Sequence, residues 1–146
     1  MSTKTKLRPD IEIGQLVDRF MRSIHFDLGR KAPAFDREKV GPLGGMVLMT
    51  LADLQPVPMH ELVRTMSRDK AQITRLLQSL GQKGLVEKLP SSTDKRVCVL
   101  RLSAKGQQTV DGLRQALAET IDEVLLPLNA DERRLLKDLL RKAFTG

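Results

Sequence analysis

The sequence is poor in the residues that build disulfide-linked or metal-bound structures. Its 146 residues include one cysteine and two histidines, and neither tryptophan nor tyrosine. A single cysteine forms no internal disulfide, which excludes a disulfide scaffold. Two histidines and one cysteine do not supply the ligands of a closed His/Cys zinc site. We therefore expect no structural metal and no cofactor.

Long apolar runs are also missing. No stretch approaches the roughly 18 apolar residues that predict a membrane span. Residues 1–8 are polar and basic, without the apolar segment of a signal peptide behind them. These features predict a soluble cytoplasmic protein with no membrane partner. With 40% hydrophobic residues, a chain of this length is expected to form one domain, residues 1–146.

The positive charge is concentrated in one part of the sequence. The net charge is +7 and the isoelectric point is about 9.9. Residues 60–110 contain ten lysines and arginines against four acidic residues, so this segment holds most of the excess. A local basic excess is typical of a surface that binds a phosphate backbone. A solvated basic surface without a partner is the alternative.

Apolar residues recur at helical spacing near the N-terminus. The pattern predicts a helix over residues 10–31, ended with the help of Pro33, and a loop over 32–42. A second helix is expected to begin near Pro42 or Leu43 and to stop before Gln55. Three side chains in these two helices are expected in the core: Phe20, Phe26 and Met46.

The next two helices form a helix-turn-helix. A short helix is predicted from Pro58, and after a turn of about four residues a second helix covers 69–81. Asp69 and Gln72 have the spacing of a capping box, in which Asp69 accepts from a first-turn backbone N–H. Gln72 could either complete this cap or contact a base, and the sequence favours neither role.

The helix over 69–81 is the candidate recognition helix. Its inner face is apolar, while its outer face presents side chains that donate hydrogen bonds to phosphates or base edges. These candidates are Lys70, Gln72, Thr74 and Arg75. Arg68, in the preceding turn, is expected to contact either phosphate or solvent.

Residues 85–102 predict a β-hairpin that follows the recognition helix. An extended segment and a strand flank the turn-forming, exposed residues 90–96. This hairpin would complete a winged helix-turn-helix over residues 43–103. Cys98 lies in the second strand among apolar neighbours, so we expect a buried and inert thiol.

The C-terminal part returns to helical spacing. A long helix is predicted over 104–126, with Ser103 as its cap and Pro127 at its end. Asn129 or Asp131 would cap a last helix. The apolar stripes of residues 10–31 and 104–146 suit packing against each other or against a second subunit. We expect these segments to be dimerisation helices.

Four sequence motifs occur in the order expected of one protein family. They are Ile73-Thr74-Arg75-Leu76-Leu77, Lys83-Gly84-Leu85-Val86-Glu87-Lys88, Asp94-Lys95-Arg96, and the segment LRLSAKG from Leu100 to Gly106. With the order of elements, they make the chain similar to the MarR family of bacterial transcriptional regulators, over essentially its whole length. The resemblance implies a mainly α-helical, winged helix-turn-helix homodimer with a small β-hairpin.

The resemblance also implies how such a dimer binds DNA. The two recognition helices would enter successive major grooves of a pseudo-palindromic operator, and each wing would reach a minor groove. Arg96 matches the family's minor-groove arginine, with Lys95 beside it. Asp94 matches the family's wing acid, and we expect it to hold Arg96 in place.

The sequence therefore predicts a sequence-specific, double-stranded-DNA-binding regulator. The resemblance implies a repressor that releases DNA when a small ligand or an oxidant acts on it, although the family's reactive cysteine of the first helix is missing here. No spacing typical of a catalytic triad, a Cys/His pair or paired carboxylates is present, so no enzyme is expected. The alternatives are a winged-helix protein-docking module and a non-specific architectural DNA-binding protein.

Overall fold

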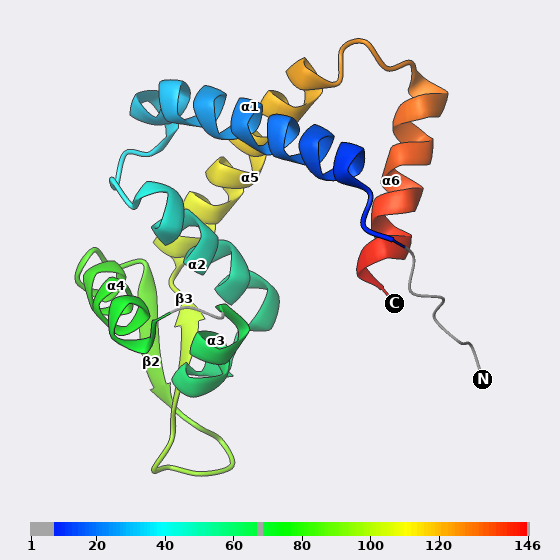
Figure 1. The fold of residues 1–146 in the computed structure, drawn as a ribbon. Coiled ribbons are helices and arrows are strands. Elements are labelled where there is room, and N and C mark those ends of the chain that lie inside the picture. The colour runs from blue at the N-terminus through cyan, green and yellow to red at the C-terminus, as the bar shows by residue number, and fades with distance from the viewer. Residues whose placement is uncertain (1–7, 67–68, 146) are drawn as a thin grey trace. The chain divides into compact units, whose positions relative to one another are not determined.

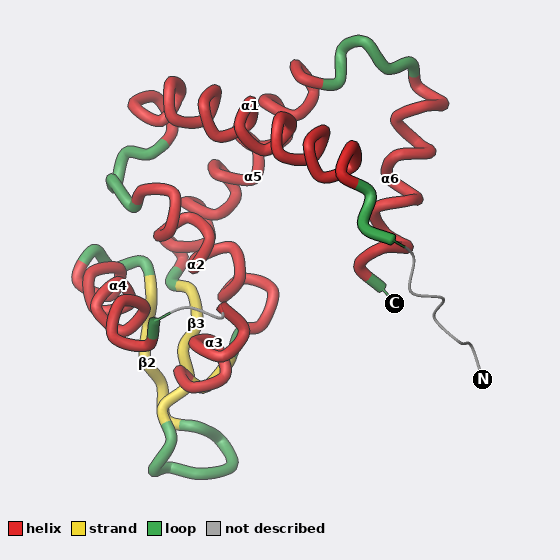
Figure 2. The backbone as a smooth tube through the Cα atoms, viewed as in Figure 1, coloured by secondary structure: helices red, strands yellow, loops and turns green. Residues whose placement is uncertain are grey.

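The computed structural model describes residues 8–66 and 69–145, and the rest of this account concerns those residues. They form a mainly α-helical fold with one small antiparallel sheet, as predicted (Figures 1 and 2). The elements are α1 (Ile11–Phe35), α2 (Gly41–Leu54), β1 (Val57–Pro58), α3 (Met59–Met66), α4 (Lys70–Gln82), β2 (Val86–Pro90), β3 (Cys98–Leu102), α5 (Ala104–Val124) and α6 (Ala130–Phe144). None of the helices described is long and apolar enough to cross a membrane.

The described chain divides into two compact units. The winged unit comprises residues 32–116, and the helical unit comprises the described residues of 1–31 and 117–146. The expectation of one domain over 1–146 stays a prediction.

The end of α1 differs from the prediction. Pro33 lies inside the helix, in its last turn, and the helix continues to Phe35. The helix continues for two residues beyond Pro33, although proline lacks the backbone N–H that would donate to the Gly29 carbonyl. The connecting loop is therefore residues 36–40 and not 32–42. Its end is fixed by Asp36, whose carboxylate accepts hydrogen bonds from the backbone nitrogens of Val40 at 2.9 Å and Gly41 at 3.0 Å.

The core of the winged unit lies between α2, α3, α4, the sheet and the start of α5. The predicted inner face of α4 is confirmed, since Ile73, Leu77 and Leu80 are buried. The largest fully buried side chains in this unit include Leu48, Leu51, Leu62, Leu85, Leu100 and Val110.

Two side chains expected in the core are exposed. Met46 on α2 is 41% exposed and Phe26 on α1 is 73% exposed. The buried face of α2 is formed by Gly44, Gly45, Val47, Leu48 and Leu51. The helical period therefore predicted the right helix. Met46, however, lies beside the buried face of α2 and not within it.

A short strand was missed at the sequence level. β1 contains only Val57 and Pro58, and it pairs with Leu100 and Val99 of β3. Two residues show no alternation that could predict a strand. The sheet order is β1-β3-β2, with β3 in the centre. Gln55 supports this arrangement, because its Oε1 accepts a hydrogen bond from the backbone nitrogen of Leu102 at 2.9 Å.

The first turn of α5 lies directly against the end of α4. The backbone nitrogen of Ser103 donates to the Leu85 carbonyl at 3.0 Å. Ser103 Oγ accepts from the backbone nitrogen of Gly106 at 2.9 Å, which confirms Ser103 as the cap of this helix. A Cβ atom added at Gly106 would overlap the Leu85 carbonyl oxygen. Only glycine fits at position 106.

The helical unit contains two helices without a buried side chain. No residue of α1 and none of α6 is buried in the described chain. Polar contacts connect the helices of this unit. Lys31 Nζ forms an ion pair with Glu123 at 2.9 Å, and Arg133 NH1 pairs with Asp122 at 3.2 Å. Asn129 forms a capping box with Glu132 at the start of α6, as one of the two predicted caps.

We predict that Gly106→Ala destabilises the protein by about 1–3 kcal/mol, because the backbone of Leu85 has to move to admit the methyl group. The matched control is Gly112→Ala in the same helix, where a Cβ atom meets nothing within 4 Å. That change should stabilise by about 0.5–1 kcal/mol through helix propensity. Urea denaturation of both variants at one protein concentration measures the difference. Equal stability of the two variants would contradict the close approach.

Candidate nucleic-acid interface

The N-terminus of α4 is fixed by Asp69. Its carboxylate accepts hydrogen bonds from the backbone nitrogens of Ala71 at 2.7 Å and Gln72 at 3.2 Å. The Asp69 half of the predicted capping box is therefore confirmed. Burial of the opposite face of the helix fixes its rotation, so the outward positions are the ones predicted from the sequence.

Three of the four candidate side chains on α4 are exposed. These are Lys70, Gln72 and Arg75, while Thr74 is half-buried. The Thr74 hydroxyl donates to the Lys70 carbonyl at 2.7 Å, so its methyl group and its lone pairs are what a ligand would meet. Arg68 lies outside the described residues.

The hairpin turn between β2 and β3 is ordered by its own side chains. Ser91 Oγ accepts hydrogen bonds from the backbone nitrogens of Thr93 at 3.3 Å and Asp94 at 3.4 Å. Asp94 Oδ1 accepts from the backbone nitrogen of Arg96 at 3.0 Å. The backbone at Arg96 is thus fixed by Asp94. The expected effect of Asp94 on the Arg96 guanidinium stays a prediction.

The wing presents its basic residues away from the core. Lys95 and Arg96 are exposed, and the turn projects beyond helices α3 and α4 of the same unit (Figure 1). α4 packs against β2, so the recognition helix and the wing belong to one packed structure. Lys70, Arg75, Lys95 and Arg96 form no ion pair with any residue that the structure describes.

Other basic residues of the 60–110 segment are engaged within the fold. Arg101 Nε forms a cross-strand ion pair with Glu87 at 2.9 Å. Lys105 Nζ pairs with Glu38 at 3.2 Å, and Lys83 Nζ donates to two backbone carbonyls. This division could not be predicted from the sequence, because the contacts of a lysine side chain depend on residues that are distant along the chain.

Cys98 is exposed, and the expectation of a buried thiol was wrong. In a strand, residues two apart share a face, so Cys98, Leu100 and Leu102 point to the same side. Leu100 and Leu102 are buried beneath the helices. Cys98 is the first residue of β3, next to the exposed residues of the wing turn.

A metal site finds no support among the residues that the structure describes. They contain no group of three or more His, Cys, Asp and Glu side chains that could hold an ion. His25 and His60 are both exposed, on α1 and α3.

This arrangement can be compared with known proteins. The model of the MarR family matches residues 45–98, which extend from α2 to the first residue of β3. The crystal structure of wild-type MarR from Escherichia coli in its apo form is 26% identical, with a TM-score of 0.75, and the match covers 96% of this chain and 99% of that one. The chain is thus similar to the MarR family in sequence over residues 45–98 and in fold over nearly its whole length.

Two further comparisons are informative. The multiple antibiotic resistance protein MarR of Escherichia coli K12 is 35% identical over 83 residues, which are 56% of this chain. The chain spans 58% of the length of the first curated relatives that it matches. The transcriptional repressor CouR, bound to a 23-mer DNA duplex, has a TM-score of 0.67 at 23% identity, covering 88% of this chain and 89% of CouR, and this likeness shows the fold.

Proposed function

We propose that this chain is a sequence-specific, double-stranded-DNA-binding transcriptional regulator of the MarR family that acts as a homodimer. The observation that carries the proposal is the set of four exposed basic side chains, Lys70, Arg75, Lys95 and Arg96, on the outer face of α4 and on the wing turn. The fold engages neighbouring basic residues but leaves this set exposed. CouR, a transcriptional repressor, has this fold while bound to DNA.

The proposed roles follow from the chemistry of each side chain. Arg75 suits a bidentate contact with a guanine edge, and Lys70 suits a phosphate. Gln72 would contact a base, while Thr74 would offer its methyl group to thymine. Arg96 would enter a minor groove narrowed by A·T pairs, where the negative potential is strongest, with Lys95 on the flanking phosphates.

A basic wing also implies a strong dependence on salt. With roughly 6–10 phosphate contacts per dimer, the logarithm of the binding constant should fall by about 0.9 per contact for each tenfold rise in salt. The resemblance stated above further implies repression and a small-molecule effector, and both are part of the proposal.

The homodimer is proposed from the uncovered apolar side chains of the helical unit. On α1, Ile13 is 59% and Leu16 is 56% exposed, and on α6, Leu135 is 58% and Leu139 is 55% exposed. A monomeric protein rarely exposes so many large apolar side chains along two helices. A second copy of the same chain would bury both stripes across a two-fold axis.

We predict that Arg75→Ala and Arg96→Ala each weaken binding to the DNA upstream of the protein's own coding sequence about 10-fold or more, since each lost base contact costs about 1–3 kcal/mol. Fluorescence anisotropy with a labelled duplex measures the affinities. The control is Arg134→Ala on α6, an exposed arginine paired with Asp131, which should bind within about twofold of wild type. Wild-type affinity of the Arg75 or Arg96 variant would remove the role proposed for that residue.

A second prediction concerns the dimer. Leu139→Lys should convert a two-chain particle into single chains at micromolar concentration, because it places a charge within the proposed apolar interface. Leu139 is exposed in the single chain, so the change leaves the chain's own core intact. Sedimentation velocity measures the mass, with Lys137→Ala on the same helix as control. A wild-type protein that sediments as one chain would refute the homodimer.

A further inference from the structure

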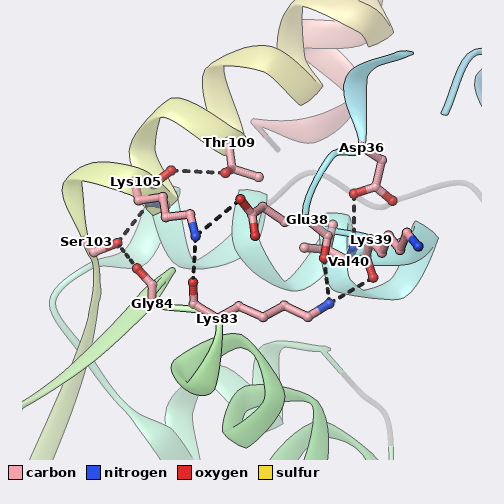
Figure 3. Close-up of polar contacts among 10 residues, drawn as sticks. Asp36, Glu38, Lys39, Val40, Lys83, Gly84, Ser103, Lys105 and Thr109 are labelled. Carbon is pink, nitrogen blue, oxygen red and sulfur yellow. Dashed lines mark hydrogen bonds and ion pairs between the residues drawn. The ribbon is translucent and has the colours of Figure 1, made fainter. Parts of the chain in front are cut away.

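Three segments that are distant in the sequence meet at the C-terminal end of α4 (Figure 3). They are the loop 36–40 between α1 and α2, residues 83–85 after α4, and residues 103–106 at the start of α5. All three belong to the winged unit. Two of the motifs that suggested the family lie here, and the proposed DNA contacts use neither of them.

The end of α4 is closed by a Schellman motif. Gly84 has a φ of +74°, its backbone nitrogen donates to the Gly81 carbonyl at 3.0 Å, and Leu85 donates to the Leu80 carbonyl at 3.0 Å. The next two backbone carbonyls accept hydrogen bonds from side chains at the start of α5. The Lys83 carbonyl accepts from Lys105 Nζ at 3.1 Å, and the Gly84 carbonyl accepts from Ser103 Oγ at 2.5 Å. A cation at this position also interacts favourably with the helix dipole.

The loop 36–40 is attached to the same helix end by Lys83. Its ammonium donates to the Glu38 carbonyl at 2.6 Å and to the Lys39 carbonyl at 3.0 Å. Two consecutive carbonyls converge on one ammonium because Lys39 has a φ of +53°, a left-handed conformation uncommon outside glycine. Asp36 fixes the far side of the loop through the backbone nitrogens of Val40 and Gly41.

An ion pair completes the connection. Lys105 Nζ lies 3.2 Å from Glu38 Oε1, with Glu38 32% and Lys105 51% exposed. The loop, the end of α4 and the start of α5 are thus each bound to the other two, as the dashed lines in Figure 3 show. We call Glu38, Lys83 and Lys105 the junction.

We propose that the junction sets the orientation of α4 for base-specific contacts, so that Glu38, Lys83 and Lys105 are positioning residues for DNA recognition. This inference rests on the proposed function. Hydrogen bonds to base edges need a functional group held within about 0.5 Å, whereas phosphate contacts carry no sequence information and tolerate more displacement. Loosening the junction should therefore reduce specific binding more than non-specific binding.

The first test is a charge exchange. Glu38→Lys, Lys105→Glu and the double variant are titrated with the duplex upstream of the coding sequence and with a random duplex of equal length. The quantity compared is the dissociation constant for the random duplex divided by that for the upstream duplex. Because net charge affects both constants, its effect on overall affinity cancels in this ratio. We expect each single variant to lower this ratio about tenfold. The double variant, which retains the wild-type net charge, should recover part of the loss, because it restores the ion pair but not the hydrogen bond that Lys105 donates to the Lys83 carbonyl.

The second test removes the ammonium that binds the loop. Lys83→Met is compared with Lys88→Met, which loses the same charge from an exposed side chain of β2 that bonds to no described residue. Only Lys83→Met should lower the ratio. Amide hydrogen exchange, which needs no DNA, should be faster in that variant at Val40, Gly41 and Leu85, and unchanged in α3.

The outcomes separate the two proposals. Single variants that keep the wild-type ratio, or a double variant that recovers nothing, would overturn the positioning role while leaving DNA binding in place. Unchanged exchange at Val40 and Gly41 in Lys83→Met would overturn it independently. A wild-type protein that binds both duplexes equally would refute the proposed sequence-specific function, and the positioning role with it.

Discussion

The backbone of Leu85 is the point on which the winged unit depends. α4 ends three residues before it and β2 begins directly after it, while its nitrogen donates to Leu80 and its carbonyl accepts from Ser103. Gly106 lies against that carbonyl without a side chain. The recognition helix, the hairpin and α5 therefore share one buried backbone position. A change there alters the relation between helix and wing, on which simultaneous contact with two grooves would depend.

The fold divides the basic residues of one segment into two classes. Lys83, Lys105 and Arg101 are held by carbonyls or carboxylates and contribute to structure. Lys70, Arg75, Lys95 and Arg96 are exposed on α4 and on the wing turn. Exposed ion pairs stabilise proteins weakly, by about 0–1 kcal/mol. The first class therefore matters mainly for geometry, and the second is available to a polyanion.

Much of this architecture was predictable because its signals are local. The inner face of α4, the Asp69 cap, the Ser103 cap and the hairpin follow from spacing within a few residues. The remainder depends on contacts across the chain. β1 is too short to show a period, and Cys98 is exposed beside the wing turn although its sequence neighbours are apolar. The roles of Lys83 and Glu38 come from segments about 45 residues apart, which no local pattern encodes.

The central claim is sequence-specific DNA binding, and a competition titration tests it most directly. The purified protein is titrated into a labelled duplex from the region upstream of its own coding sequence, with excess unlabelled random duplex present. We expect the protein to stay bound to the labelled duplex in the presence of the competitor, with two chains per duplex. Binding that the competitor removes would contradict it in favour of a non-specific architectural protein, and negligible affinity for either duplex would favour a protein-docking module.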